Sequence, residues 1–383
     1  MQLVVHKILF LFWIVLGLSL PVQAANKILI PPAPSIAAQS FILIDFNSGK
    51  LLAEKNADQK LAPASLTKVM TVYVIFRELK NGHLTLDEKV TISKKAWQTG
   101  GSRMFVEVNK QVSVEDLLQG VIIQSGNDAS VALAEHVAGD ESTFAAMMNQ
   151  HATRLGMKNS HFVNSMGLHD DQHYTTARDL SILTQALIRE FPEYYKWDSQ
   201  KEFTYNNITQ PNRNVLLWRD KSVDGVKTGY TEEAGYCMIA SAKREDMRLI
   251  SVVMGTASPN ARANESQALL NYGFRFYETH KLYASAQPLT ESRIWKGDVQ
   301  QLPVGLSKDL YVTIPRRYYN DLKAEISLEP KIIAPVNQGD ALGEVNVMLA
   351  GNVVAKETLV ALKTVSKGGL MHRLYDEALL LLE

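Results

Sequence analysis

Three apolar segments lie close together between Val223 and Gly255, separated by polar stretches of only a few residues. They read VDGVKTG, GYCMIASAK and MRLISVVMG. Connections this short join antiparallel strands, whereas parallel strands need a crossover of a dozen or more residues. The sequence therefore predicts an antiparallel sheet of at least three consecutive strands, and the fold must be built around that sheet.

Helical patterns and one hairpin surround these strands in the sequence. The stretches SVEDLLQGVI and STFAAMMNQHATRLG are typical of capped, amphipathic helices, and SFILIDFNSGKLLAE reads as two strands joined by a tight turn. A further helix is expected from about Pro259 to His280, where it would cover the sheet. Together these elements predict an α+β domain over residues 36–281.

A different pattern begins near Leu282. Alternating apolar residues and a tight turn at Gly351-Asn352 predict a small β-rich domain over residues 285–365. It carries no group of residues suited to chemistry, so a spacer or docking role is expected. The remainder, residues 366–383, predicts an amphipathic helix that either packs on its own domain or lies in a bilayer surface, and we expect it to attach to a membrane.

The N-terminal residues 1–24 have the features of a signal peptide. Lys7 precedes an apolar run over residues 8–20, and small residues follow where a signal peptidase would cut. The run is shorter than the roughly 20 residues of a membrane span, so we expect cleavage, with an uncleaved anchor as the alternative. The following PPAPS predicts a stiff linker before the first domain.

Composition narrows the possible partners. Without residues 1–24 and their single Lys7, 39 basic residues face 40 acidic ones, a formal charge of −1 that does not suggest nucleic acid binding. The 359 residues that remain of 383 suffice for two domains. The single cysteine, Cys237, cannot form an internal disulfide, and its apolar strand favours a core position over a nucleophilic role.

The stretch PASLTKVM, at the start of a predicted helix, holds a candidate nucleophile. Ser65 and Lys68 are three residues apart, which is close enough on a helix for the two side chains to exchange a proton. A serine hydroxyl needs a base, and lysine serves only if its pKa falls from about 10.4 toward roughly 7 to 8. Burial and a second cation lower the pKa of a lysine, and Lys227 in VKTGY is the candidate cation.

A third fragment, QSGNDASVALAE, precedes a helical pattern and supplies Ser125 and Asn127. A hydroxyl and a carboxamide two residues apart on a loop can point into one cleft, where one relays a proton and the other orients a carbonyl. Gly229, beside Lys227, has no side chain and would let a substrate backbone lie along the strand. Each fragment alone is common, but the three in this order indicate a catalytic site.

The complete set resembles the motifs of serine β-lactamases and penicillin-binding proteins. It stands here as Ser65-Leu66-Thr67-Lys68, Ser125-Gly126-Asn127 and Lys227-Thr228-Gly229. With HFVNSMGLHDDQHYTTARDL after the second motif and NRNVLLW before the third, the chain looks like the low-molecular-mass D-alanyl-D-alanine carboxypeptidases, serine peptidase family S11. The similarity runs from about residue 38 to the end and includes the β domain and terminal helix of the enterobacterial-type members.

This resemblance implies a β-lactamase/DD-peptidase-like first domain, an exported periplasmic protein held peripherally at the inner membrane, and neither cofactor nor metal. It implies that neutral Lys68 takes the proton of Ser65, which attacks the bond between two D-alanines of a peptidoglycan pentapeptide. Ser125 would pass a proton to the leaving amine, Asn127 would hold the substrate amide, and charged Lys227 would attract the terminal carboxylate.

The resemblance also assigns supporting groups. Thr228 would hydrogen-bond the carboxylate, and the backbone N–H groups of Ser65 and Tyr230 would form the oxyanion hole. Some relatives have histidine where this chain has Tyr230, so a role for that side chain is not carried over. Arg213 or Arg262 would add a guanidinium near the carboxylate. β-Lactam antibiotics are expected as covalent inhibitors.

Other readings of the sequence remain open. His169, Asp170, Asp171 and His173 cluster, but no Gly-x-Ser-x-Gly elbow accompanies them, and a polar loop accounts for them better than a metal site. A β-lactamase would need an activating glutamate, yet HFVNSMGL has no acid before Asp170. A penicillin sensor or wall-binding scaffold, acylated without turnover, is the non-catalytic alternative.

Overall fold

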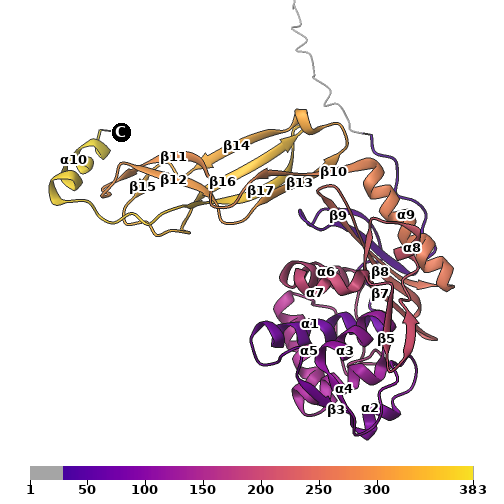
Figure 1. Ribbon diagram of the computed structural model, residues 1–383. Coiled ribbons are helices and arrows are strands. Elements are labelled where there is room, and N and C mark those ends of the chain that lie inside the picture. Colours follow the sequence, from indigo (N-terminus) through magenta and orange to yellow (C-terminus); the bar gives the residue numbers. More distant parts are fainter. Residues whose placement is uncertain (1–28, 383) are drawn as a thin grey trace, which may run out of the picture.

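The computed structural model describes residues 29–382 of the chain. An α+β domain is followed by an elongated all-β domain, and a short helix lies at the far end of the β domain (Figure 1). The predicted fold class is confirmed. The predicted signal peptide, residues 1–24, lies outside the described residues.

The α+β domain is built on one five-stranded sheet in the order β2-β1-β9-β8-β7. Its strands are β1 (Ser40–Asp45), β2 (Leu51–Lys55), β7 (Val223–Thr231), β8 (Gly235–Arg244) and β9 (Met247–Thr256). All neighbouring pairs are antiparallel, which confirms the arrangement predicted for the three consecutive strands. The early hairpin joins this sheet through β1, where Leu43 lies opposite Ser251 of β9.

Helices cover both faces of the sheet, because successive residues of a strand point to opposite sides. In β1, Ile42 belongs to the larger core, with the central helices, and Leu43 belongs to the core under α9. The larger core contains α1 (Lys68–Lys80), α3 (Val114–Gln119), α4 (Asn127–Ala138), α5 (Glu141–Leu155) and α6 (Ala177–Glu190). The other face carries α8 (Leu216–Arg219) and α9 (Pro259–Phe276).

Shorter elements complete the helical region. They are the helices α2 (Lys94–Gln98) and α7 (Pro192–Tyr195), the hairpins β3 (Lys89–Thr91) with β4 (Gln111–Ser113) and β5 (Glu202–Tyr205) with β6 (Ile208–Pro211), the 3-10 turns η1 (Ala64–Thr67) and η3 (Lys196–Ser199), and the π turn η2 (Gly120–Gln124).

Helix α9 ends at Phe276, so the predicted extension to His280 is wrong. The chain continues as strand β10 (Tyr277–Tyr283), which pairs with β13 (Leu310–Pro315) of the next domain. Tyr277 and Thr279 are buried while Glu278 between them is partly exposed, the alternation of a half-buried strand. Pairing with a strand more than 30 residues later overrides the local helical pattern.

The β domain contains a six-stranded sheet in the order β14-β16-β17-β12-β11-β15. Its strands are β11 (Pro288–Trp295), β12 (Gln301–Leu306), β14 (Lys323–Leu328), β15 (Ile332–Ile333), β16 (Ala341–Leu349) and β17 (Asn352–Ala361), with a 3-10 turn η4 (Tyr319–Asp321) before β14. Val304, Val345, Val347 and Leu359 lie in its core.

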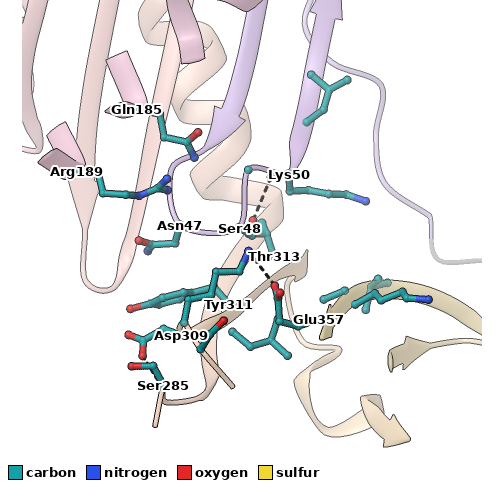
Figure 2. A pocket seen from close by; sticks show the side chains of 18 residues that line it. Asn47, Ser48, Lys50, Gln185, Arg189, Ser285, Asp309, Tyr311, Thr313 and Glu357 are labelled. Carbon is teal, nitrogen blue, oxygen red and sulfur yellow. Dashed lines mark hydrogen bonds and ion pairs between the residues drawn. The ribbon is translucent and has the colours of Figure 1, made fainter. Parts of the chain in front are cut away.

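A buried polar contact joins the two domains. Asp45, at the end of β1, accepts hydrogen bonds from the Ser48 backbone N–H and from the Thr279 hydroxyl, at 2.7 Å each. Thr313 of β13 lies 2.9 Å from Thr279 and 2.5 Å from Ser48 through its Oγ1. Beside this contact a polar groove lies between the domains, lined among others by Asn47, Gln185, Arg189, Asp309, Tyr311 and Glu357 (Figure 2).

The predicted linker PPAPS is not a free spacer in the structure. The Pro31 carbonyl accepts a hydrogen bond of 3.0 Å from the Tyr272 hydroxyl of α9, and Ala33 packs against the core of that face. Ile36, just after the segment, is buried in the same core. The segment is therefore part of the α+β domain, because α9 offers it an apolar surface that the local sequence does not reveal.

Helix α10 (Leu370–Leu380) packs on the β domain through its polar face. Asp376 is buried, accepts from the Lys296 backbone N–H, and pairs with Arg293 at 3.4 Å. The apolar residues of this helix and of the two positions that follow it face outward: Leu370, Met371, Leu374, Tyr375, Leu381 and Leu382 are all more than half exposed. The helix thus presents an unpaired apolar stripe to its surroundings.

Candidate active site

The turn that carries Ser65 is a 3-10 turn that leads directly into α1. Leu66 donates its N–H to the Pro63 carbonyl at 3.1 Å, the i to i+3 bond of a 3-10 turn, and the α-helix itself begins at Lys68. The predicted helix is therefore present, but its first turn is wound more tightly. Apolar residues bury α1, and Lys68 is itself fully buried.

The Lys68 amine has three oxygen neighbours. Its Nζ lies 3.0 Å from Ser65 Oγ, 2.7 Å from Asn127 Oδ1 and 2.6 Å from the Met166 carbonyl oxygen. The Asn127 amide is oriented by its Nδ2, which donates to the Gly100 carbonyl at 2.7 Å. Asn127 Oδ1 and the Met166 oxygen can only accept, so they take the two N–H bonds of a neutral amine. The lone pair then remains for the hydroxyl proton of Ser65.

The surroundings favour the neutral form of this amine. Burial lowers the pKa of Lys68 well below its ordinary value of 10.5, and the positive charges of Lys227 and Arg213 lower it further. Asp128 acts in the opposite direction, with a smaller effect. Lys68 therefore has the two conditions that a lysine base requires, desolvation and a neighbouring cation.

Lys227 is buried in β7, on the strand beside the Ser65 turn. Burial, together with Arg213 and Arg262, lowers its pKa to about 7, while Asp198 acts to raise it. A group with this pKa is partly charged at neutral pH, and a bound carboxylate would favour its charged form. Lys227 is thus suited to hold an anion while repelling a proton from Lys68.

Gly229 has a structural role in addition to the one expected from the sequence. A Cβ at this position would lie 3.1 Å from the Pro63 carbonyl oxygen and 3.2 Å from the Ser65 nitrogen. The missing side chain therefore lets β7 approach the turn that carries Ser65. Strand β7 lies at the edge of the sheet and Gly229 also lines a pocket, so the expectation that a substrate backbone lies along this strand stays a prediction.

One pocket collects most of the predicted site residues. Its lining includes Ser65, Ser125, Arg213, Thr228, Gly229, Tyr230 and Arg262. A neighbouring pocket shares Ser65, Arg213 and Tyr230 and adds Asn127. Ser125 is buried, and its backbone adopts the left-handed conformation (φ 65°). Among the described residues its Oγ has no hydrogen-bond partner. A buried hydroxyl without a partner, facing a pocket, is available to a bound molecule.

Three residues of this pocket lining, Arg213, Arg262 and Tyr230, contact other parts of the protein. Arg262 donates to the Gly229 carbonyl at 2.9 Å, and Arg213 donates to the Gln124 carbonyl at 3.2 Å, so both guanidinium groups are held by the backbone. The half-exposed Tyr230 ring stacks on Tyr236 with centroids 4.2 Å apart. Two fixed cations in the lining of one pocket favour an anionic ligand.

Two contributors to the site were missed from the sequence. The Met166 carbonyl is a backbone group, which every residue has, so no residue type in the sequence could have indicated its role. His173, taken for part of a polar loop, is buried, accepts from the Val163 N–H at Nδ1, and so donates from Nε2 to Thr67 Oγ1 at 2.7 Å. His173 does lie in a loop, but its side chain is buried and supports the turn between Ser65 and Lys68, which the sequence did not indicate.

The rival sites gain no support from the geometry. Cys237 is buried in β8, and burial raises the pKa of its thiol to about 11, so it is a poor nucleophile. Within residues 29–382 no group of three His, Cys, Asp or Glu side chains is arranged to hold a metal ion.

Comparisons with known proteins agree with this arrangement. The family model for peptidase S11, D-alanyl-D-alanine carboxypeptidase, matches residues 27–258, and a model for the C-terminal domain of penicillin-binding protein 5 matches residues 277–367. The chain is 46% identical to the D-alanyl-D-alanine carboxypeptidase DacC of Escherichia coli (strain K12), over 90% of this chain and 88% of that protein. It is 43% identical to DacA of Haemophilus influenzae, over 90% and 89% of the two chains.

Solved structures show the same likeness. Penicillin binding protein 5 from Haemophilus influenzae superposes with a TM-score of 0.85 at 42% identity, covering 88% of this chain and all of that one. Penicillin binding protein 6B from Escherichia coli superposes with a TM-score of 0.73 at 36% identity, covering 86% and 96% of the two chains.

The buried His173 predicts a pH-dependent stability. Burial lowers its pKa from 6.5 to about 4, so the unfolded chain binds a proton that the native state excludes between these values. The contribution of neutral His173 to the free energy of unfolding is complete above pH 6.5 and is lost as the pH falls toward 4. The loss is about 2 kcal/mol at pH 5. Urea unfolding at pH 7 and pH 5 should show a smaller decrease for His173→Gln than for the wild type. The exposed His83→Gln should behave like the wild type, and equal decreases for all three would contradict this assignment.

Proposed function

The chain belongs to the D-alanyl-D-alanine carboxypeptidase family, peptidase S11, and on that premise we propose that it removes the terminal D-alanine of peptidoglycan pentapeptides through an acyl-enzyme on Ser65. The observation that carries this proposal is the contact of the buried Lys68 amine with Ser65 Oγ and two acceptor oxygens. That arrangement gives a serine hydroxyl a base with its lone pair free. Removal of D-alanine would place the protein in cell-wall biogenesis and the control of cell shape.

In the proposed acylation, Ser65 Oγ attacks the carbonyl between the two D-alanines while its proton moves to Lys68 Nζ. The developing oxyanion is held by the backbone N–H groups of Ser65 and Tyr230. Ser125, whose hydroxyl has no partner among the described residues, passes its proton to the leaving amine as the C–N bond breaks and takes the proton from Lys68 in its place, so that Lys68 is neutral again. Asn127 holds the substrate amide. Water then hydrolyses the ester and restores the Ser65 hydroxyl.

The terminal carboxylate of the substrate is proposed to lie at the cationic end of the pocket. Lys227 attracts it, the Thr228 hydroxyl donates to it, and Arg213 and Arg262 add positive charge from the pocket wall. This assignment explains why the backbone holds both guanidinium groups in place. It also makes the enzyme selective for a free C-terminus.

β-Lactams are proposed to acylate Ser65 and to leave slowly. The loop HFVNSMGL contributes no carboxylate of its own, and Glu141, which contacts it, already accepts from the Ser165 N–H and hydroxyl at 3.1 and 2.8 Å. An activating carboxylate of the class A β-lactamase kind is therefore not available from these groups. The expected outcome is inhibition.

Export and attachment complete the proposal. Residues 1–24 would direct the chain to the periplasm, and helix α10 would hold it peripherally at the inner membrane. Within residues 29–382 no helix is both long and apolar enough to cross a membrane. Support for attachment comes from α10, whose polar face packs on the β domain while its apolar stripe stays exposed.

The catalytic proposal predicts release of one D-alanine from a defined muropeptide pentapeptide. Mass analysis should show the tetrapeptide with the wild type and an intact pentapeptide with Ser65→Ala, because the hydroxyl in contact with the Lys68 amine is that of Ser65. Labelled penicillin should mark the wild type only. Wild-type protein that binds penicillin covalently but releases no D-alanine would instead indicate a penicillin sensor or scaffold.

The carboxylate site predicts a pH dependence. The pKa of Lys227 is about 7, so its positive charge disappears above that pH while Arg213 and Arg262 stay charged. The quantity to measure is the ratio of two kcat/KM values, that of a peptide with a free C-terminus over that of the same peptide with an amidated C-terminus. This ratio should fall as the pH rises from 6 to 9, and the decrease should approach tenfold per pH unit above about 7. Lys227→Arg should flatten the decrease. A ratio independent of pH in the wild type would remove Lys227 from carboxylate recognition.

The attachment proposal predicts binding to phosphatidylcholine vesicles through the stripe on α10. Leu374→Gln and Leu381→Gln should each weaken binding about tenfold, because half-burying a leucine contributes about 1.4 kcal/mol. Ile326→Gln, at an exposed apolar residue of β14, is the matched control. Cosedimentation measures the effect, and equal binding of all variants would show that α10 does not mediate attachment.

A further inference from the structure

The carbonyl of Met166 is held in place by a hydrogen-bonded loop over residues 164–168. Asn164 Oδ1 accepts from three successive backbone N–H groups, those of Met166, Gly167 and Leu168, at 3.2, 2.7 and 3.2 Å. Asn164 Nδ2 in turn donates to the Leu168 carbonyl at 2.9 Å. These hydrogen bonds fix the shape of the loop. The orientation of the loop relative to Lys68 therefore depends on its contacts with residues outside 164–168.

Ser165 connects this loop to two helices through hydrogen bonds. Its carbonyl accepts from the Thr71 hydroxyl of α1 at 2.5 Å, one turn beyond Lys68. On the opposite side, Glu141 Oε1 accepts from both the Ser165 N–H and its hydroxyl. Ser165 is fully buried and the Glu141 side chain is only 12% exposed, so both contacts are shielded from water. The residue next to the catalytic carbonyl is thus clamped between the base-bearing helix and Glu141.

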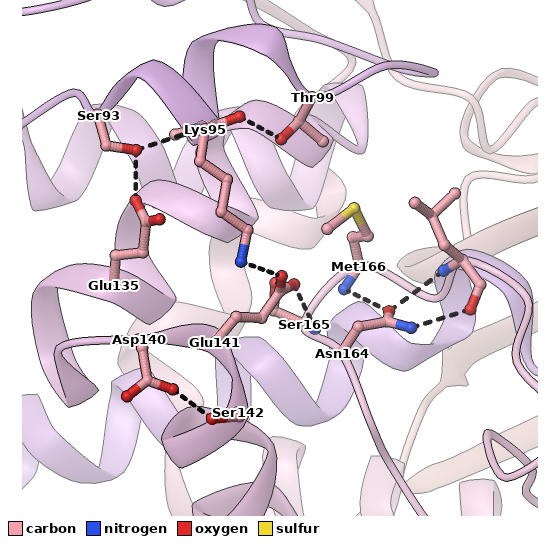
Figure 3. Close-up of polar contacts among 12 residues, drawn as sticks. Ser93, Lys95, Thr99, Glu135, Asp140, Glu141, Ser142, Asn164, Ser165 and Met166 are labelled. Atoms are coloured by element: carbon pink, nitrogen blue, oxygen red, sulfur yellow. Dashed lines mark hydrogen bonds and ion pairs between the residues drawn. The ribbon is translucent and has the colours of Figure 1, made fainter.

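Glu141 is itself anchored, as Figure 3 shows. It stands in the first turn of α5, where the helix dipole favours a negative charge. Its second oxygen pairs with Lys95 of α2 at 2.9 Å, although the Lys95 side chain is 57% exposed and the pair contributes little by itself. The acceptor oxygen toward Ser165 is the part of Glu141 that reaches the site.

We propose that Glu141 is a positioning residue for the acylation of Ser65: by clamping Ser165 it places the Met166 carbonyl on one N–H of Lys68, which directs the amine's lone pair at the serine hydroxyl. This inference rests on the proposed function of Ser65 and Lys68. Without the clamp, the carbonyl is free to move away, the amine rotates, and the proton transfer loses its alignment. Glu141 contacts Ser165 and is not among the residues that line the pockets beside Ser65, so replacing Glu141 should leave the noncovalent binding of a ligand nearly unaffected.

The test separates noncovalent binding of a fluorescent penicillin from the first-order acylation step by stopped-flow measurement on the full chain. Glu141→Ala should slow acylation roughly 10- to 100-fold, the range that a displacement of about 1 Å produces, while the noncovalent Kd changes less than about twofold. Glu141→Gln should stay within about threefold of the wild type, because its amide oxygen can still accept from Ser165. Ser165→Ala, which removes only the hydroxyl contact, should fall between them.

Glu135→Ala is the matched control. Glu135 accepts from the Ser93 hydroxyl of the same α2 region at 2.6 Å, away from the 164–168 loop, so the Glu135→Ala variant should be acylated at the wild-type rate. Thermal unfolding of each variant shows whether it is folded. Wild-type acylation in Glu141→Ala, an equal loss in Glu141→Gln, or a loss confined to Kd would each overturn the positioning role. A wild type that penicillin does not acylate would overturn the proposed function instead.

Discussion

A buried lysine amine whose partners within residues 29–382 are a hydroxyl, an amide oxygen and a carbonyl is the constraint on which this structure depends. Burial of a charged amine is costly, and the two other cations near Lys68 increase that cost, so the amine is driven toward its neutral form. A neutral amine has two N–H bonds and one lone pair. The Asn127 and Met166 oxygens occupy the first two, which leaves the third for Ser65.

The fold supplies this environment by combining segments that are far apart in the chain. The Ser65 turn, the start of α4 and strand β7 meet because the sheet and the helical region share one core. Gly229 permits the close approach of β7 to the turn, and His173 supports the turn from the other side through Thr67. Each contact is ordinary, but together they exclude water from the amine and hold its partners in place.

Much of this could be predicted from the sequence, and the failures have physical causes. The antiparallel strands, the helix after Ser65 and the three motifs of the site follow from local patterns and from motif chemistry, whereas Tyr230, Arg213 and Arg262 in the pocket lining were assigned through the family resemblance. The helix end at Phe276 was missed because pairing of β10 with a distant strand decides it. The burial of His173 and the packing of the PPAPS segment were missed for the same reason, since each depends on a surface formed by residues far away in sequence.

The sequence by itself determined which chemical groups are present: a hydroxyl and an amine one turn apart, a second amine in a strand, and a hydroxyl and amide on a loop. These are properties of residue type and short spacing, which local geometry preserves. Only the tertiary structure decided that the Lys68 amine is buried from solvent and that the Met166 carbonyl contacts it. It also decided that the polar side of α10 packs on the β domain. Desolvation and backbone direction arise from contacts between distant segments, so no local pattern can encode them.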